Sequence, residues 1–380
     1  MKTVERITCL DGMRGLAALW VLVGHTMLLT GYRVPILSQP ELGVDLFILL
    51  SGYLMVFQYQ IRRTREDWSK FPAWTSFWIR RFFRLSPLYF LLLFVALIAG
   101  DALYSDRSFI DQSLGRTPQL EERYNDLSAT NVLMHLSYLY GIFPEYAFRT
   151  PLPDWSLSLE MQFYAVFPLL VLACEKAGWL RTAIITAIGC FGAVVLMKWL
   201  GVGFPMPSFL PLKMHIFLAG MLVAVSQGRR RYLMAALVLA VFPYGGAVSF
   251  LHLASRELLV LGFFLIVTAQ GSRIVALISS FLSSRPLYWT GELSYGSYLV
   301  HLLVLHPVAS FAISIWGSTQ APIARFFFVL PIVLIITYLL SAALFFSVEK
   351  PGQDLGRVVL RWMGRREGAR QTEAERIDAP

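Results

Sequence analysis

The stretch that decides the fold of this chain is Arg14-Gly-Leu-Ala-Ala-Leu-Trp-Val-Leu-Val-Gly-His25, an apolar run with a cation at its start and an imidazole at its end. His25 follows Arg14 by eleven residues. That spacing is about three turns of an α-helix, so both side chains project from one face and His25 lies about 16 Å further along the axis. In a bilayer, Arg14 would lie at a water boundary and His25 near the midplane or past it. An ionisable group at that depth is costly and indicates function, although a hydrogen bond to a neighbouring helix is the alternative.

The composition indicates a membrane protein. Of the 380 residues, 56% are hydrophobic and 15% are charged, whereas an ordinary soluble domain has about 25% charged residues. The net charge of +9 comes from short clusters between apolar runs. This pattern is typical of membrane topology and argues against a nucleic-acid partner. The three cysteines have no CxxC spacing, so neither a disulfide framework nor a zinc site is expected.

The apolar runs predict an all-α polytopic membrane protein with about ten transmembrane helices. Clusters of Lys and Arg at 62–86, 229–231, 273–285 and 350–380 fall on one side of the membrane if both termini are cytoplasmic. The predicted spans are 15–30, 43–61, 87–104, 159–177, 180–200, 209–226, 232–250, 256–271, 288–314 and 325–347.

The segments between the spans differ in character. The polar connection 105–154 is expected on the outer side, and its apolar middle, 132–143, is too short to span and predicts a re-entrant or interfacial segment. The segment 77–87 mixes aromatic residues with arginines, which is typical of a helix lying on the membrane surface. We therefore expect a membrane domain over 1–350 and a basic, flexible cytoplasmic tail over 351–380.

Four groups of polar residues lie in or beside the predicted spans. Arg14 and His25 form the first group, and Asp11, one turn earlier, is placed to pair with Arg14. Asp45 and Ser51 form the second group, at the start of the second span. Asp45 either belongs to a site or is an interfacial anion favoured by the helix dipole.

The other two groups come from later spans. Glu160 is expected within the fourth span, as a proton donor, a proton acceptor or a partner of a histidine, unless it lies in headgroup water at the helix N-terminus. Ser294, Tyr298 and His301 are spaced by 4 and 3 residues and share one helix face. Two histidines and a carboxylate from three helices are thus expected at similar depth. No metal is expected, because no His-x₃-His or Glu-x-x-His pair is present among them.

A cluster of arginines is expected at the inner membrane surface, at Arg80, Arg81 and Arg84. One interpretation is an anchor for lipid headgroups. The other is a clamp for a phosphate-bearing ligand, because the guanidinium fork binds phosphate oxygens bidentately.

Taken together, these residues resemble the membrane acyltransferase 3 family, the integral O-acyltransferases of bacterial glycans. The resemblance covers nearly all the predicted spans, and the six motifs occur in order. Two positions depart from the family pattern, since Met161 stands where a second acidic residue is common and Lys213 where an arginine is frequent. The motifs are Asp11-Gly-x-Arg14-Gly with His25, Gly43-Val-Asp-Leu-Phe with Leu50-Ser-Gly-Tyr-Leu, Phe77-x-x-Arg80-Arg81-x-x-Arg84-x-x-Pro87, Trp155-Ser-Leu-x-x-Glu160-x-x-Phe163-Tyr164, Ser294-Tyr295-x-x-Tyr298-Leu-x-His301 and Glu349-x-Pro351.

The resemblance implies an enzyme of the bacterial inner (plasma) membrane that transfers an acyl group from cytoplasmic acyl-CoA to a hydroxyl group of a polysaccharide. Acetyl-CoA is the expected donor substrate by family frequency, and no permanently bound cofactor is expected. The implied partners are membrane lipids, acyl-CoA, the glycan acceptor and the machinery of polysaccharide biosynthesis. Rival hypotheses are a transporter or flippase that moves a lipid-linked sugar without chemistry, and a scaffold in an export complex.

The same resemblance, together with the expected depths, assigns roles to the polar groups. His25 is the general base that takes the proton of the acceptor hydroxyl, or else the carrier of a covalent acyl group. Glu160 orients His25 or neutralises the imidazolium ion. The donor is bound by Arg14, Arg80, Arg81 and Arg84, and the acceptor or the developing oxyanion is contacted by Asp45, Ser51, Ser294, Tyr298 and His301.

Overall fold

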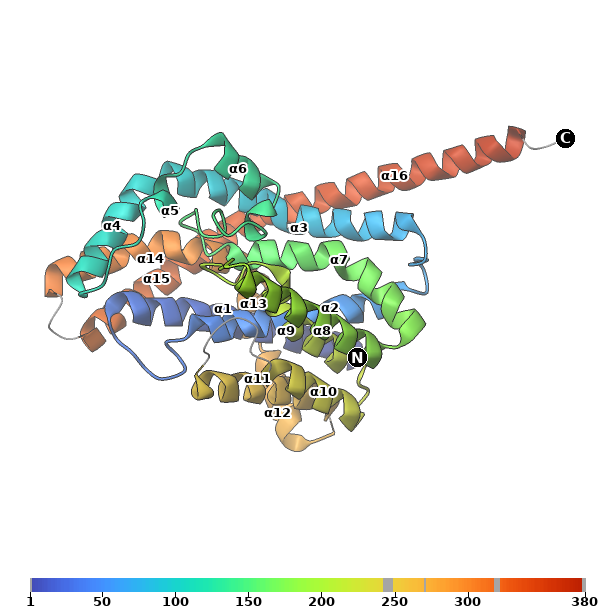
Figure 1. Ribbon diagram of the computed structural model, residues 1–380, viewed down its shortest axis with the longest axis horizontal. Coiled ribbons are helices and arrows are strands. Elements are labelled where there is room, and N and C mark those ends of the chain that lie inside the picture. The colour runs from blue at the N-terminus through green and yellow to red at the C-terminus, as the bar shows by residue number, and fades with distance from the viewer. Residues whose placement is uncertain (1, 242–248, 270, 318–321, 378–380) are drawn as a thin grey trace.

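The computed structural model describes residues 2–241, 249–269, 271–317 and 322–377, which form a bundle of helices (Figure 1). No strand occurs in these ranges, so the predicted all-α fold is confirmed. The helices are α1 (Lys2–Thr30), α2 (Pro40–Arg62), α3 (Phe71–Ile98), α4 (Gly100–Ser113), α5 (Glu122–Asn125), α6 (Ala129–Leu136), the 3₁₀ turn η1 (Leu139–Gly141), α7 (Trp155–Ala177), α8 (Trp179–Trp199), α9 (Leu210–Val225), α10 (Arg230–Val241), α11 (Phe250–Thr268), α12 (Arg273–Leu282), α13 (Arg285–Glu292), α14 (Ser294–Trp316), α15 (Pro322–Leu344), the π-helical turn η2 (Phe345–Glu349) and α16 (Lys350–Ile377).

Eight helical segments within the described ranges are long and apolar enough to cross a membrane, which makes the chain a multi-pass membrane protein. They are α1, α2, α3, α7, α8, α11, α14 and the continuous run that begins with α15. One predicted span differs, because α9 is apolar but has only 16 residues. Helix α10, described as Arg230–Val241, covers the first part of the predicted span at 232–250. The rest of the predicted span at 232–250 lies largely outside the described residues. The sidedness of the loops and termini stays a prediction.

The helix of the third span begins earlier in the chain than the sequence predicted. Helix α3 runs without a break from Phe71 to Ile98, so the arginine-rich segment 77–87 is continuous with the helix of the third span rather than a separate helix. Pro87, the predicted start of the span, lies inside the helix. A proline removes one backbone hydrogen bond, but buried residues on both sides of it, Phe77 and Leu88, hold the two halves of the helix against the bundle.

The long polar connection after α3 is folded rather than extended. It contains α4, α5, α6 and η1, and its apolar middle forms the eight-residue helix α6 and the turn η1, too short to span as predicted. Ser128 caps α6, because its hydroxyl accepts a hydrogen bond from the Asn131 amide at 3.2 Å.

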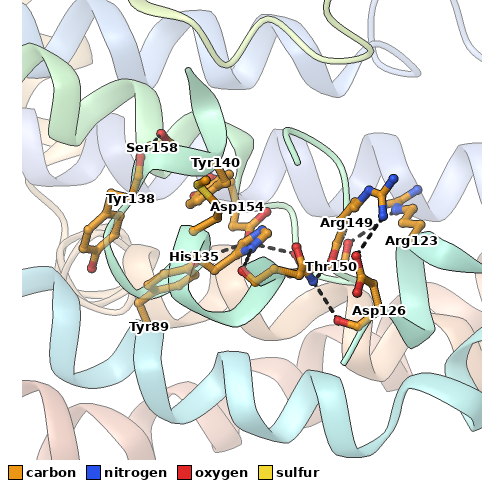
Figure 2. A network of polar contacts seen from close by, with 12 residues as sticks. Tyr89, Arg123, Asp126, His135, Tyr138, Tyr140, Arg149, Thr150, Asp154 and Ser158 are labelled. Carbon is orange, nitrogen blue, oxygen red and sulfur yellow. Dashed lines mark hydrogen bonds and ion pairs between the residues drawn. The ribbon is translucent and has the colours of Figure 1, made fainter. Parts of the chain in front are cut away.

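A buried polar network ties this connection to α3 and α7 (Figure 2). Its centre is Asp154, the residue before α7, whose carboxylate accepts hydrogen bonds from Tyr89 at 3.0 Å and from Thr150 at 2.8 Å. Tyr140 donates to the Asp154 carbonyl at 2.6 Å, and His135 lies 3.8 Å from the carboxylate. Burial raises the pKa of the Asp154 carboxyl group, which these partners partly offset. Asp154 therefore anchors the loop, and its side chain makes no capping hydrogen bond to α7.

Small residues let α2 and α9 approach closely. A Cβ atom built on Gly52 would lie 2.2 Å from the Phe217 carbonyl oxygen, and one on Gly220 would lie 2.0 Å from the Leu49 carbonyl oxygen. Neither space admits a methyl group without moving a backbone. Without a hydrophobic driving force between helices in lipid, close backbone approach of this kind supplies much of the packing energy.

We expect Gly220→Ala to destabilise the fold by about 1–3 kcal/mol, the usual cost of overpacking. The matched control is Gly189→Ala in α8, where a Cβ meets nothing within 4 Å. Alanine is the better helix former, so the control should be neutral or stabilising. Thermal unfolding of the two variants in detergent micelles measures the difference. Equal midpoints for the two variants would show that the contact between α2 and α9 is not tight.

The tail begins as helix α16, which projects beyond the bundle in Figure 1. Its first turns pack on α3, where a Cβ on Gly352 would lie 2.7 Å from Pro87 and one on Gly356 2.7 Å from Phe83. The division into a membrane domain over 1–350 and a flexible tail stays a prediction.

Candidate active site

A cavity lies where α1, α2, α3, α7, α9 and α14 meet. It holds about 850 Å³ of space free of protein atoms, its open mouth included. Apolar side chains such as Val44, Phe47 and Phe217 form much of its wall. The polar residues on the wall are Arg14, Ser51, Gln58, Arg81, Arg84, Ser156, Glu160, Tyr164, Ser294, Tyr295 and Tyr298.

Three of the four predicted donor-binding arginines lie on the cavity wall: Arg14, Arg81 and Arg84. Arg81 is only 6% exposed, and two contacts fix its guanidinium group. It donates a hydrogen bond to Gln58, and it lies 5.4 Å from the ring centre of Tyr164. A buried guanidinium held by a neutral amide and an aromatic face keeps its positive charge available to an anionic ligand.

The fourth predicted arginine, Arg80, is separate from the cavity. Its Nη2 donates to the Glu66 carboxylate at 2.9 Å, in the turn between α2 and α3, and it is not among the described residues of the cavity wall. Successive helical residues project about 100° apart. Arg80 and Arg81 therefore face different surroundings although they are neighbours in the sequence.

Glu160 is the carboxylate on the cavity wall. It accepts hydrogen bonds from Ser51 at 3.1 Å and from Tyr164, one turn later on α7. On the same wall Arg14 pairs with Asp11 at 3.9 Å, as predicted. Glu160 and the arginines balance part of each other's charge inside the bundle, which lowers the cost of burying both.

His25 and His301 contact each other, and the similar depth predicted for them is thereby confirmed. His25 Nδ1 and His301 Nε2 are 3.1 Å apart, and the ring centres are 5.1 Å apart. The partner of His25 in the structure is thus His301 rather than Glu160, which bonds to Ser51 and Tyr164. Neither histidine is among the described residues that line the cavity.

Tyr298 connects the cavity to the histidine pair. It lies on the cavity wall, and its ring centre is 6.0 Å from that of His301, one turn further along α14. Its hydroxyl donates to the Pro153 carbonyl at 2.6 Å and lies 2.7 Å from the Ser156 hydroxyl. Because the phenol has a single proton and Pro153 receives it, Tyr298 accepts the hydrogen bond from Ser156. Ser294, also on the wall, has a buried hydroxyl without a hydrogen-bond partner among the described residues.

Asp45 lies apart from Ser51, with which the sequence analysis grouped it. It is 2% exposed and is surrounded by basic side chains from α9 and α11: Lys213 at 2.6 Å, Arg256 at 2.9 Å and His252 at 3.6 Å. Asp45 is therefore neither an interfacial anion nor a described part of the cavity wall. It holds α2 against two other helices, and Lys213, whose role was open, is one of its partners.

The sequence analysis missed several members of the site. Gln58 and Tyr164 hold Arg81, and Ser156 holds Tyr298. These residues could have been found from the sequence, because each lies one or two helical turns from Ser51 or Glu160 and therefore on the same helix face. The partnership of Asp45 with Arg256 carried no signal, because 211 positions separate the two residues in the chain.

Residues 7–342 match the family model described as the acyltransferase domain. No solved structure matches the fold significantly.

The chain is similar to curated proteins that include the following two. The chain is 26% identical over 350 residues to "Peptidoglycan O-acetyltransferase OatA" of Listeria monocytogenes, covering 84% of this chain and 52% of the relative. It is 33% identical over 200 residues to "Putative membrane-bound transacylase BcsY" of Komagataeibacter xylinus, covering 50% and 44%. The chain thus spans about half the length of these relatives.

Proposed function

The chain belongs to the acyltransferase family whose model matches most of its length, and from this premise we propose that it moves an acyl group, acetyl in the first instance, from cytoplasmic acyl-CoA to a hydroxyl group of a cell-surface or lipid-linked polysaccharide. Membership makes it an acyltransferase enzyme of a membrane. One observation supports the finer proposal above the others: a cavity with three arginines on its wall extends to Tyr298, which lies against the histidine pair.

The arginines suit the donor. Coenzyme A carries its phosphates at one end and its thioester at the end of a flexible arm. Arg14, Arg81 and Arg84 would hold the phosphates, because a charge-assisted hydrogen bond to phosphate is about twice as strong as a neutral one. The apolar wall between the arginines and Tyr298 would take the arm. The cytoplasm as the source of the donor follows from the predicted sidedness of α3.

The chemistry at the thioester needs a base. His25 takes the proton of the acceptor hydroxyl as that oxygen attacks the thioester carbonyl, so that an O–H bond breaks and a C–O bond forms. Collapse of the tetrahedral intermediate breaks the C–S bond, and the proton on His25 passes to the departing thiolate of coenzyme A. Glu160 and Ser51 would then position the acceptor or the arm from the cavity wall.

The names of the relatives support the proposed class of acceptor. OatA is named for peptidoglycan, and we propose a glycan of the cell envelope as the acceptor of this chain. We further propose the bacterial inner (plasma) membrane as the site of action, and the machinery of polysaccharide biosynthesis as the partner that supplies the glycan.

The test of the proposed function measures the release of free coenzyme A. Vesicles containing the full chain receive radiolabelled acetyl-CoA with peptidoglycan fragments or membrane-bound glycans as probe acceptors. We expect free thiol and labelled glycan to appear together, and neither to appear with His25→Ala. Movement of a lipid-linked sugar without thiol release would indicate the rival carrier function. Thiol release that is unaffected by His25→Ala would leave transfer intact and overturn the assigned base.

A further inference from the structure

We propose that His301 is a positioning residue, which fixes the proton on the ring of His25 so that the Nε2 atom of His25 carries a free lone pair. This inference rests on the proposed function, in which His25 is the general base. Two hydrogen bonds of His301 carry it, and each allows one direction only.

The first hydrogen bond fixes the tautomer of His301. Its Nδ1 atom lies 2.7 Å from the carbonyl oxygen of Tyr298, three residues earlier on α14. A carbonyl oxygen can only accept, so Nδ1 carries the proton and donates it. In a neutral imidazole the other nitrogen then has no proton, and His301 Nε2 is an acceptor.

The second hydrogen bond fixes the tautomer of His25 on α1. His301 Nε2 lies 3.1 Å from His25 Nδ1. Because Nε2 of His301 can only accept, Nδ1 of His25 must carry the proton and donate it. The remaining nitrogen of His25, Nε2, is then unprotonated. That is the form a general base needs before the reaction.

A positive charge on His301 would reverse the direction of the hydrogen bond between His301 and His25. If His301 carried protons on both nitrogens, it would donate to His25 Nδ1 and leave a proton on His25 Nε2, which would block the base. The histidines of the described chain that lie within ion-pair distance of a carboxylate are His135 and His252. A charge on His301, which is fully buried in a helix that spans the membrane, would therefore lack an anionic partner and be costly.

The arrangement also serves the step after proton abstraction. When Nε2 of His25 has taken the proton of the acceptor, the ring is an imidazolium ion, and its Nδ1 proton still points at the lone pair of His301. The hydrogen bond becomes charge-assisted and stronger at the moment when the charge appears. Both nitrogens of His301 are engaged within the protein. In this proposal His301 therefore positions His25 and does not take the role of acceptor contact that the sequence analysis gave it.

The test measures the tautomer directly and apart from activity. The full chain, labelled with ¹⁵N-histidine, is reconstituted in lipid bilayers, and solid-state NMR distinguishes protonated from unprotonated ring nitrogens. The His25 signals are those lost in His25→Gln. We expect His25 to carry its proton on Nδ1 in the wild type. In His301→Leu part of the His25 population should change to the other tautomer. We expect a loss of about 10- to 100-fold in kcat, because fewer molecules carry the competent tautomer and the charge-assisted hydrogen bond to the imidazolium ion is lost.

Two further variants sharpen the result. In His301→Gln the amide oxygen can accept in place of Nε2, so the Nδ1 tautomer of His25 should return and kcat should be higher than in His301→Leu. His306→Leu, a buried histidine five residues later on α14, should leave the tautomer of His25 unchanged. A proton on Nε2 of His25 in the wild type, or an unchanged tautomer in His301→Leu, would overturn the inference. The expected tautomer without any acyl transfer would instead refute the proposed function alone.

Discussion

Replacement of His25 by glutamine is expected to lower kcat for acyl transfer by about 10²- to 10⁴-fold, the contribution of a positioned general base. The KM for acetyl-CoA should change little, because the arginines on the cavity wall, and not His25, are placed to hold the donor. Glutamine is polar, is similar in size to histidine and can still donate a hydrogen bond to His301. The contact between α1 and α14 is therefore expected to remain. Single-turnover kinetics with radiolabelled acetyl-CoA in vesicles separates the two parameters.

The matched control is His252→Gln, which changes a histidine of α11 that also contacts a polar side chain of another helix. His252 lies beside Asp45, away from the His25 pair, so its replacement should cost far less in kcat. A His25→Gln enzyme with turnover close to that of the wild type would show that another group removes the proton, with Glu160 on the cavity wall as the next candidate.

Replacement of Arg84 by glutamine is expected to raise the KM for acyl-CoA by about 10- to 100-fold and to leave kcat within a few fold. The reason is the loss of one hydrogen bond between charged groups, worth about 1.5–3 kcal/mol. Because the phosphates lie at the far end of the donor from the thioester, the bond holds the ground state and the transition state equally. Titration of acetyl-CoA in the thiol-release assay gives both parameters.

Arg80→Gln provides the control from the same helix. The sequence analysis gave Arg80, Arg81 and Arg84 one role, but Arg80 is bound to Glu66 outside the cavity wall. Its replacement should leave the KM for acyl-CoA nearly unchanged. Equal effects of Arg80→Gln and Arg84→Gln would mean that the arginines act together as a diffuse positive surface, and the cavity would then not be the donor site.

The fold class followed from composition and from the lengths of apolar runs, because the bilayer imposes those lengths on any helix that crosses it. The boundaries that failed have a local cause. Pro87 looked like the start of a span because proline favours first turns, yet the packing of residues on both sides of it keeps α3 continuous. Nothing in a single sequence states how strongly a neighbour will support a helix through a proline.

The sequence by itself determined that this chain spans a membrane, that Arg14 and His25 share a helix face, and that Ser294, Tyr298 and His301 share another, since helical periodicity is local. Only the tertiary structure decided which faces meet. It placed His301, rather than Glu160, against His25, separated Arg80 from Arg81, and surrounded Asp45 with Lys213 and Arg256. The physical reason is that these contacts join residues far apart in the chain. Their geometry depends on how closely the helices pack, and that is set by side-chain shape at every interface together.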